Sequence, residues 1–358
     1  EKTIHTAFLI CAAIGIMIGV FCILFARPML QALHTKSDLI DAAVLYLKIY
    51  ALGMPAMAVY NFGNGVLSAK GDTKSPLIYL AVAGVLNIIL NLIFVIGFHL
   101  AAAGVAIASA IAQYVSMLLV MRNLLKRRDV CRLQISKIQF HQDVAKGILL
   151  MGIPTGLQNA IFALANLFVQ RGVNYFYTIM VSGNAAATNA DAIIFNVMSA
   201  FYTGCASFVS QNRGAGNRER MKKSYLVALT YSFLIGLFLG ACLFFGGRYF
   251  LRAFATDRAV IDAGMERIKI MAFAYSISAF MDCTIAASRG LGKSIGPMII
   301  VMLGSCVFRI IWVYTIFAHF HTIPSLYLLY PFSWTLTAIA EIAYFIVQFR
   351  KVMPKSRI

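Results

Sequence analysis

The chain has 358 residues, of which 61% are hydrophobic and 12% charged, and its mean hydropathy is +0.81. A soluble domain carries about 25% charged residues, so this composition argues against a soluble enzyme or binding domain and favours a membrane protein. The formal net charge of +18 comes from Lys and Arg that lie mainly in short segments between apolar runs. Membrane topology accounts for such segments, and no basic helix or RNA-binding motif accompanies them, so we do not expect nucleic-acid binding.

Long apolar runs follow one another along the chain, and the first, Ala7 to Phe25, contains no charged residue. Runs of 18 or more apolar residues are candidate membrane helices, and several here exceed the roughly 20 residues that a bilayer requires, which indicates tilt. The sequence therefore predicts an all-α membrane protein that lies in the lipid bilayer. Ten spans are expected, at about 6–30, 41–68, 75–98, 102–123, 145–176, 187–210, 224–247, 262–288, 296–318 and 325–349.

The loops between these spans alternate in charge. Segments 98–102, 177–185 and 318–324 contain no Lys or Arg, whereas the intervening loops and the end of the chain, with Lys355 and Arg357, are basic. Cytoplasmic loops carry an excess of Lys and Arg, so we predict that the basic loops and both termini are cytoplasmic, in a plasma or inner membrane. A further basic segment, with Arg248, Arg252 and Arg258, breaks the alternation, and we interpret it as an amphipathic segment at the outer interface.

An internal repeat relates the two parts of the chain. Residues 27–76 match residues 248–297 without a gap, and thirteen positions are identical. Parallel repeats in a membrane protein are typical of transporters with two lobes. The pairs include Arg27 with Arg248, Ile40-Asp41-Ala42 with Ile261-Asp262-Ala263, Gly71 with Gly292, and Pro76 with Pro297, and Asn61 aligns with Asp282.

The repeat also predicts the domain organisation. We expect an N-terminal lobe over 1–127, a basic cytoplasmic linker over 128–143 and a C-terminal lobe of six helices over 144–358. The partner of the second copy would begin about 78 positions before the first residue, so we expect two helices of the first copy to be missing and an intact protein of twelve spans.

No pattern of residues indicates an enzyme. GxSxG, HExxH and a complete Walker motif are absent, and Gly292-Lys293-Ser294 lacks the upstream glycine spacing of a phosphate-binding loop. The seven cysteines have no CxxC spacing, and six of them lie in apolar runs, so we expect neither disulfides nor a metal site. We expect no organic cofactor.

Polar residues inside the spans are the candidates for chemistry, because an ionisable group in hydrocarbon is costly and faces a cavity or a partner. For the amides we favour packing between helices over a role in binding, whereas for Asp191, Asp282 and Arg309 we favour function. Asn87 and Asn91 share one helix face, and Ser109 and Gln113 of the next span are expected to face them. The candidates for a substrate cavity are Asn61, Asn166, Gln170, Asp191, Asp282 and Arg309. Glu341 is another ionisable residue inside a span, and for it the structural and functional roles are weighed evenly.

Two prolines and a glycine-rich turn indicate where the helices bend or stop. Pro55 and Pro154 lie inside predicted spans, where each is expected either to kink its helix or to be tolerated. In the segment Ser210 to Tyr225, Gly214 and Gly216 are suited to the left-handed conformation that stops a helix, and five cations follow or flank them. We interpret this segment as a tight cytoplasmic hinge.

Several motifs together carry a family resemblance. The run Phe208-Val-Ser-Gln-Asn-Arg-Gly-Ala-Gly-Asn217, with Gln211, Asn212 and Gly214, resembles the Q-N-x-G-A motif of multidrug and toxic compound extrusion (MATE) transporters. The turns Leu67 to Pro76, with Gly71 and Asp72, and Ser288 to Pro297, with Gly292, are similar to the paired R-G-x-G-D-x-x-x-P turns of that family. Gly152 to Gly156 resembles the opening of its seventh helix. The resemblance implies two six-helix lobes that open alternately to each side, in a monomer.

The same resemblance implies a function. It predicts export of amphipathic, often cationic drugs or toxins, driven by inward H⁺ or Na⁺. Many members hold the coupling ion with an N-x-x-x-D pair and a Thr, and Asn87, Asn91 and Ser109 stand at those positions here. Asn91 replaces the carboxylate, and Phe162 stands near the position of a Glu that other members use. Asp191 and Asp282 do not match the acidic positions of the family clearly.

Two other classes of function stay open on the sequence alone. A flippase for lipid-linked oligosaccharide precursors shares this architecture, but it should carry a strongly cationic cavity, and the spans offer mainly Arg309 and Arg171. A membrane scaffold or receptor that transports nothing would not need buried carboxylates.

Overall fold

A computed structural model describes residues 1–32, 37 and 39–352. In this part of the chain every regular element is a helix, and nine helices are long and apolar enough to cross a membrane. The number rises to ten if α2 (Ile40–Ala51) and α3 (Met54–Ala69), which meet at an angle of 42°, are counted as one broken span. The expected all-α fold with about ten spans is thus confirmed. Lys355 and Arg357 lie outside the described residues.

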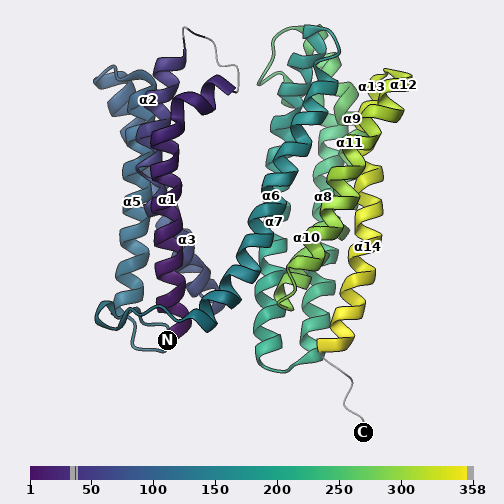
Figure 1. Cartoon of the computed structure of the whole chain (residues 1–358). Coiled ribbons are helices and arrows are strands. Elements are labelled where there is room, and N and C mark those ends of the chain that lie inside the picture. The colour runs from purple at the N-terminus through teal and green to yellow at the C-terminus, as the bar shows by residue number, and fades with distance from the viewer. Residues whose placement is uncertain (33–36, 38, 353–358) are drawn as a thin grey trace. The chain divides into compact units, whose positions relative to one another are not determined.

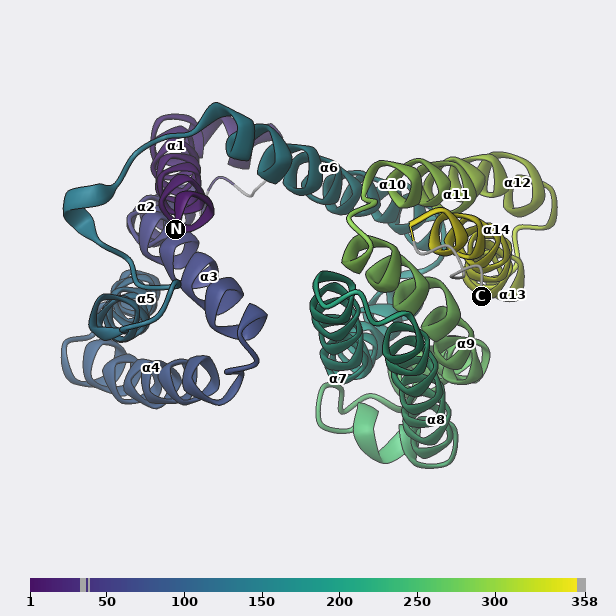
Figure 2. The ribbon, with the colours of Figure 1, turned by 90° about the horizontal axis from the view of Figure 1, so that it is seen from below.

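The chain divides into two compact units, residues 1–148 and 149–358 (Figure 1). The sequence placed the lobe boundary in the linker before residue 144, and the exact extent of the lobes stays a prediction. The first unit contains α1 (Lys2–Ala32), α2, α3, α4 (Lys74–Leu92) with the π-helical turn η1 (Ile93–Gly97), α5 (Ala101–Lys126), and the short 3₁₀ turn η2 (Ile135–Lys137). In this unit α4 packs beside α5, as Figure 2 shows along the helix axes.

The second unit is also helical throughout its described residues. Helix α6 (Gln142–Val173) begins before the boundary and continues into this unit. It is followed by α7 (Thr178–Gly214), α8 (Arg218–Leu251) and α9 (Arg258–Gly290), then by one long, irregular helix made of α10 (Ile295–Val301), η3 (Met302–Val307), α11 (Phe308–Trp312), η4 (Val313–Phe317) and α12 (Ala318–Phe320), and finally by α13 (Ile323–Tyr327) and α14 (Leu329–Val352).

Local sequence signals set several helix boundaries. Asn217, Asp257 and Thr322 accept backbone N–H groups at the starts of α8, α9 and α13, as good N-cap residues do. Pro55 is in the first turn of α3, where its missing N–H costs nothing, and α2 breaks just before it, so this proline marks a bend. Pro154, by contrast, lies inside the uninterrupted helix α6 and is tolerated there.

Helix α9 is the centre of the second unit. Its most apolar window is 72% buried, against 6% for the span formed by α4 and η1, because α7, α8 and α14 all pack against it (Figure 2). Small residues allow the close approach: an added Cβ on Gly183 of α7 would come within 2.6 Å of the backbone nitrogen of Gly264 on α9. Arg267 of α9 is therefore held among neighbouring helices.

The internal repeat is visible in the structure. Shifting the first copy by 221 positions brings α1, α2–α3, α4–η1 and α5 onto α8, α9, α10–η4 and α13–α14. The ion pair between Arg27 and Asp41 recurs between Arg248 and Asp262, where the atoms are 2.7 Å apart. Gly71 and Gly292 both have positive φ, of 85° and 72°. The two copies thus share an ion pair and a turn conformation as well as sequence similarity.

Candidate functional site

Ionisable and amide side chains are brought together at four places inside these apolar helices. One lies in the first unit and three in the second. Because groups of this kind are costly in hydrocarbon, each place is a candidate for binding or for a structural contact that the fold requires. The described residues contain no group of three or more His, Cys, Asp or Glu side chains that could hold a metal ion.

In the first unit the predicted amides form a hydrogen-bonded chain between α4 and α5. Asn91 donates to Asn87 at 3.1 Å, and Asn87 donates across to Ser109 at 3.4 Å. The side-chain oxygen of Asn91 is buried and has no partner among the described residues, so one acceptor is left over. Gln113, which was expected to face the same group, packs instead against Gly53 at the break between α2 and α3. We call Asn87, Asn91 and Ser109 the amide chain.

The second unit contains a direct buried ion pair. Asp191 of α7 pairs with Arg267 of α9 and also accepts a hydrogen bond from Tyr275. Arg267 is only 4% exposed, and it donates a second bond to Asn184 at 2.6 Å. Tyr327 donates to the same Asn184 oxygen at 2.8 Å. These five residues form the Asp191 cluster, in which both carboxylate oxygens have a partner.

The aromatic rings of α13 and α14 complete this cluster. The guanidinium carbon of Arg267 lies 5.1 Å from the ring centre of Tyr327 and 5.6 Å from that of Tyr330. A cation over an aromatic face gains electrostatic stabilisation that grows when water is excluded. Arg267 therefore ties α7, α9, α13 and α14 to one another, which gives the Asp191 cluster a strong structural role beside any role in binding.

Arg309 of α11 is buried too, but its partners are neutral. It is 2% exposed, donates to Asn166 at 3.2 Å and to Ser333 at 3.4 Å, and lies 4.7 Å from the ring centre of Tyr330. Its guanidinium also lies 5.6 Å from the ring centre of Phe162. Asn166 and Arg309, two of the residues predicted for a substrate cavity, are thus in direct contact.

A fourth place joins α9 and α14 through two carboxyl groups, Asp282 and Glu341. Asp282 is partly exposed, and the charges of Arg289 and Arg309 act on it. Glu341 is fully buried and is acted on by the charges of Arg289 and Asp282. We call Asp282 and Glu341 the carboxyl pair. Unlike Asp191, neither residue forms an ion pair within the described part of the chain.

Other predicted residues do not join these groups. Asn61, the repeat partner of Asp282, is exposed on α3. Gln170 donates to Asn174 at 2.9 Å near the end of α6, whereas Asn166 of the same helix accepts from Arg309, so the two amides make separate contacts. Arg171 is exposed and donates to Tyr314 at 3.4 Å. These polar residues do lie within predicted spans, but their spacing in the sequence did not show which partner each side chain would contact.

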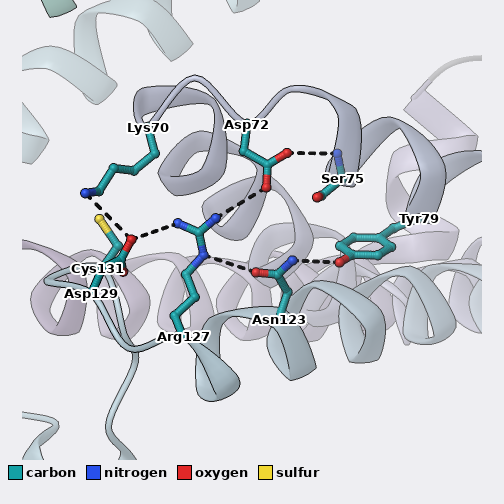
Figure 3. Close-up of polar contacts among 8 residues, drawn as sticks. All are labelled: Lys70, Asp72, Ser75, Tyr79, Asn123, Arg127, Asp129 and Cys131. Atoms are coloured by element: carbon teal, nitrogen blue, oxygen red, sulfur yellow. Dashed lines mark hydrogen bonds and ion pairs between the residues drawn. The ribbon is translucent and has the colours of Figure 1, made fainter.

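The turn between α3 and α4 is held by Arg127, which follows α5 (Figure 3). Arg127 lies 3.3 Å from a carboxylate oxygen of Asp72 and 3.3 Å from one of Asp129, and it donates to Asn123 at 3.2 Å. Asp72 also accepts the backbone N–H of Ser75 at 3.1 Å, so it caps α4. The predicted turn motif with Gly71 and Asp72 is therefore a structural anchor in this unit.

The turn between α7 and α8 differs from its prediction in one residue. Gly216 has a φ of 69°, whereas Gly214 is the last residue of α7, so only the second of the two expected glycines adopts the left-handed conformation. Asn212 donates to the carbonyl oxygen of Phe208 at 2.8 Å, and Gln211 is partly buried at the end of the same helix. The wrong assignment arose because a C′ glycine follows the helix, and α7 extends further than expected.

Arg213 links this turn to the one between α9 and α10. Its guanidinium packs against Gly292, where a side chain would meet it. Gly292 has a positive φ, which a residue without a Cβ adopts at little cost. The two predicted turn motifs of the second unit, with Gln211 and Gly292, thus lie side by side.

Sequence reasoning did not select Arg267, Asn184 or Arg289. Arg267 stands beside Glu266 and Lys269, which form an exposed pair at 3.5 Å, so the segment resembled an ordinary charged helix end. The available signal was the spacing of eight between Arg267 and Tyr275, which places both on one face of a helix. Arg289 was assigned to a basic loop, yet it is the last basic residue of α9 and donates to Gln158 of α6 at 3.0 Å.

Comparison with known proteins gives the same assignment from several directions. The chain is 28% identical over 272 residues to "Probable multidrug resistance protein YpnP" of Bacillus subtilis, a match that covers 76% of this chain and 61% of that protein. It is 23% identical over 284 residues to "FAD transporter" of Shewanella oneidensis, which covers 76% of this chain and 61% of that one. The chain thus spans under two thirds of the length of these curated relatives.

Solved structures show the same fold. A MOP superfamily transporter from Pyrococcus furiosus superposes with a TM-score of 0.91 at 18% identity, over 98% of this chain and 79% of that one. An outward-facing multidrug resistance MATE family transporter superposes with a TM-score of 0.90, again at 18% identity and over 98% and 79% of the two chains. The MatE family model matches residues 1–93 and 154–315, which is more than half of the sequence. The chain therefore belongs to the MATE family of transporters.

Proposed function

We propose that the protein is a secondary antiporter that exports amphipathic or cationic drugs or toxins in exchange for H⁺ or Na⁺, by alternating access of its two lobes. Membership of the MATE family supports transport rather than an enzymatic reaction. The names of several relatives, such as the multidrug resistance protein of Bacillus subtilis, support drug-like substrates. We further propose that it works as a monomer in the plasma or inner membrane, with both termini in the cytoplasm.

The observation that carries this proposal is the presence of buried charged groups in helices that are otherwise apolar. Arg309 and Glu341 are each less than 5% exposed within the second unit, and neither forms an ion pair among the described residues. An ordinary membrane anchor or scaffold gains nothing from such groups, since each costs several kcal/mol to bury without compensation. A transporter uses them, because they can differ in charge or hydration between two states of the protein.

Energy coupling then follows from differential affinity. A ligand shifts the balance between two conformations only as far as it binds one of them better. We propose that the coupling ion and the exported compound favour opposite states, with the amide chain and the charged groups of the second unit as the sites that distinguish them. The amide chain is neutral, so by itself it can solvate a cation but cannot balance its charge.

The test is transport by the purified, intact protein in liposomes. We expect Asn87→Ala and Asp282→Asn each to lower the efflux of an organic cation driven by a proton or sodium gradient, because the first removes a side-chain amide from the amide chain and the second removes an ionisable group from the carboxyl pair. Glu219→Gln is the matched control, since Glu219 pairs with Lys223 on an exposed helix start. Full efflux by the double variant would remove both residues from the mechanism.

The balance of acidic and basic residues in the second unit separates the antiporter from the flippase. A cavity for a pyrophosphate-linked lipid needs a clear excess of cations. In the second unit the cations Arg267, Arg289 and Arg309 are offset by Asp191, Asp282 and Glu341, so the helices supply as many acidic as basic groups there. This balance favours export of drugs over movement of an anionic lipid.

The same liposomes separate the alternatives. Gradient-driven movement of an organic cation supports the antiporter. Movement of a fluorescent lipid-linked pyrophosphate between leaflets, without dependence on an ion gradient, supports the flippase. A protein that folds and inserts but moves neither compound would favour a scaffold or receptor.

A further inference from the structure

Glu341 is the most isolated ionisable group among the described residues. Its side chain, in the middle of α14, is 0% exposed, and neither of its carboxyl oxygens has a hydrogen-bond partner in the described part of the chain. Asp191 shows the contrast, because both of its oxygens are bonded to cluster partners. A full carboxylate without partners would cost several kcal/mol to bury, whereas a neutral carboxyl group costs far less.

The groups around Glu341 come from every helix that packs against α14. Helix α9 contributes Asp282 and Arg289, whose charges act on Glu341. On α14 itself, Tyr344 stands one turn further along and packs against Gly296 of α10. From η3, Ser305 is bonded to Thr337 at 2.9 Å. The remaining titratable or charged neighbours of this region are Cys306 of η3, Arg309 of α11, Tyr327 of α13 and Tyr225 of α8, which stacks on Phe345.

The two nearby cations do not neutralise Glu341 by contact. Arg289 donates to the neutral amide of Gln158, and Arg309 donates to Asn166 and Ser333. They act on the carboxyl pair only through space, and Asp282 opposes them with a like charge toward Glu341. The surroundings of Glu341 exclude water, so they favour its neutral form. Water or a cation that comes closer would stabilise the ionised form.

The lack of hydrogen-bond partners around the carboxyl group of Glu341 indicates which coupling ion it can bind. Sodium and other metal ions bind through several oxygen atoms at once, and neither carboxyl oxygen of Glu341 has a hydrogen-bond partner among the described residues. A proton needs no such shell, since it forms a covalent O–H bond with one carboxyl oxygen. The surroundings of Glu341 therefore fit H⁺ and do not fit a metal cation.

We propose that Glu341 is a proton-binding site of the second unit, which takes up H⁺ from water on one side of the membrane and releases it on the other. Asp282, which is partly exposed, is the group that modulates this proton, because the two carboxyls of the pair cannot both be ionised cheaply. The π-helical turn η3 packs against the same stretch of α14, and such turns often mark functional sites. This inference rests on the proposed antiport and specifies its coupling ion.

Infrared spectroscopy of the purified, intact protein in lipid tests the site without transport. A buried, protonated carboxyl group gives a C=O stretching band that is separate from carboxylate bands and shifts in D₂O. We expect this band at neutral pH in the natural protein and in the E219Q control, and its loss in E341Q. Glutamine has the shape of the neutral acid, so E341Q should fold, and its thermal unfolding in detergent checks this.

Two outcomes would overturn the proposal. One is a band that persists unchanged in folded E341Q, and the other is a band that disappears in D282N but not in E341Q, which would move the proton to Asp282. If E341Q does not fold, Glu341→Asp serves instead: it keeps the acid but shifts its position, and a displaced band supports the site whereas an unmoved band contradicts it.

Transport by the same variants distinguishes this inference from the proposed function. We expect E341Q to lose transport driven by a pH gradient, with no gain from replacing the proton gradient by a sodium gradient. If the natural protein transports and E341Q keeps its full dependence on the pH gradient, the site is wrong and the antiport stands. If the natural protein transports nothing, the antiport fails, and the infrared result still decides whether Glu341 holds a proton.

Discussion

At the scale of single residues, what separates the buried charges of the second unit is whether they touch an opposite charge. Arg267 and Asp191 form a direct pair that Tyr275, Asn184 and Tyr327 complete. Glu341 has no such partner among the described residues. A closed pair holds helices together in one arrangement, whereas an open carboxyl group is free to change its charge. Stability and coupling are therefore expected to depend on different residues of the same unit.

Replacement of Arg267 by Met should destabilise the protein by about 3–5 kcal/mol, since it leaves the carboxylate of Asp191 buried without its counter-ion. Thermal and denaturant unfolding in detergent measures the loss. Lys223→Met is the matched control: its partner Glu219 is exposed, and such i,i+4 pairs contribute roughly 0.3–0.5 kcal/mol. Adding Asp191→Asn to the Arg267 variant should recover part of the stability. Equal effects of the two Met substitutions would contradict the structural role of the Asp191 cluster.

The sequence predicted the residue-scale picture in part. It selected Asp191, Asp282 and Arg309, because a charge inside an apolar run is conspicuous. It did not select Arg267, because partners 76 positions apart in sequence are decided by how helices pack. The amide chain was found because Asn87 and Asn91 are one helical turn apart and Ser109 of the next span was expected to face them.

At the scale of elements, nearby residues in the sequence set where the helices begin and end, whereas the burial of each helix depends on how the helices pack. Pro55 marks the break between α2 and α3, and Asn217 caps α8. Gly214 was wrongly expected to adopt the left-handed conformation. A glycine indicates that a helix ends nearby, but it does not fix the residue at which the helix ends. That α9 would be the central helix could not be read from its composition, since its hydropathy is lower than that of the exposed α4.

Two of the turn glycines with positive φ, Gly71 and Gly292, offer a matched test at this scale. Gly71→Ala should cost roughly 1–2 kcal/mol, because a left-handed residue with a Cβ is strained although the space around it is open. Gly292→Ala carries the same backbone strain and also presses on the guanidinium of Arg213, so it should cost more. Unfolding of the two variants under the same conditions gives the comparison. A larger loss for Gly71→Ala would contradict the contact between Arg213 and this turn.

At the scale of the whole molecule, the order of the spans predicts which loops share a side of the membrane. Single cysteines are introduced at residues 100, 179 and 322 in one set, and at 72, 129 and 292 in the other, in a background without the natural cysteines. The first set should react with a membrane-impermeant reagent only from outside, and the second only after the cells are opened, because basic loops stay in the cytoplasm. Labelling of members of both sets from outside would contradict the predicted topology.

The fold class, the number of spans and the repeat were all accessible from the sequence, because hydropathy and internal similarity are properties of the chain itself. The extent of the lobes stays a prediction: residues 128–143 read as a linker, and the boundary between the two compact units falls inside α6. The periodicity of a sequence does not show which side chains meet between helices. Such a contact distinguishes Asp191, which pairs with Arg267, from Asp282 and Glu341, which form no ion pair among the described residues.

The recurrence of one ion pair, Arg27 with Asp41 and Arg248 with Asp262, has an evolutionary consequence. A contact that recurs at matching places in both halves is what duplication and fusion of one ancestral bundle would leave. Once two copies exist, they are free to specialise: at the matching positions 61 and 282 one copy has a neutral amide and the other an acid. If Glu341 binds the coupling proton as we propose, the second copy has become the half that exchanges protons with water, whereas the amide chain of the first copy stays neutral.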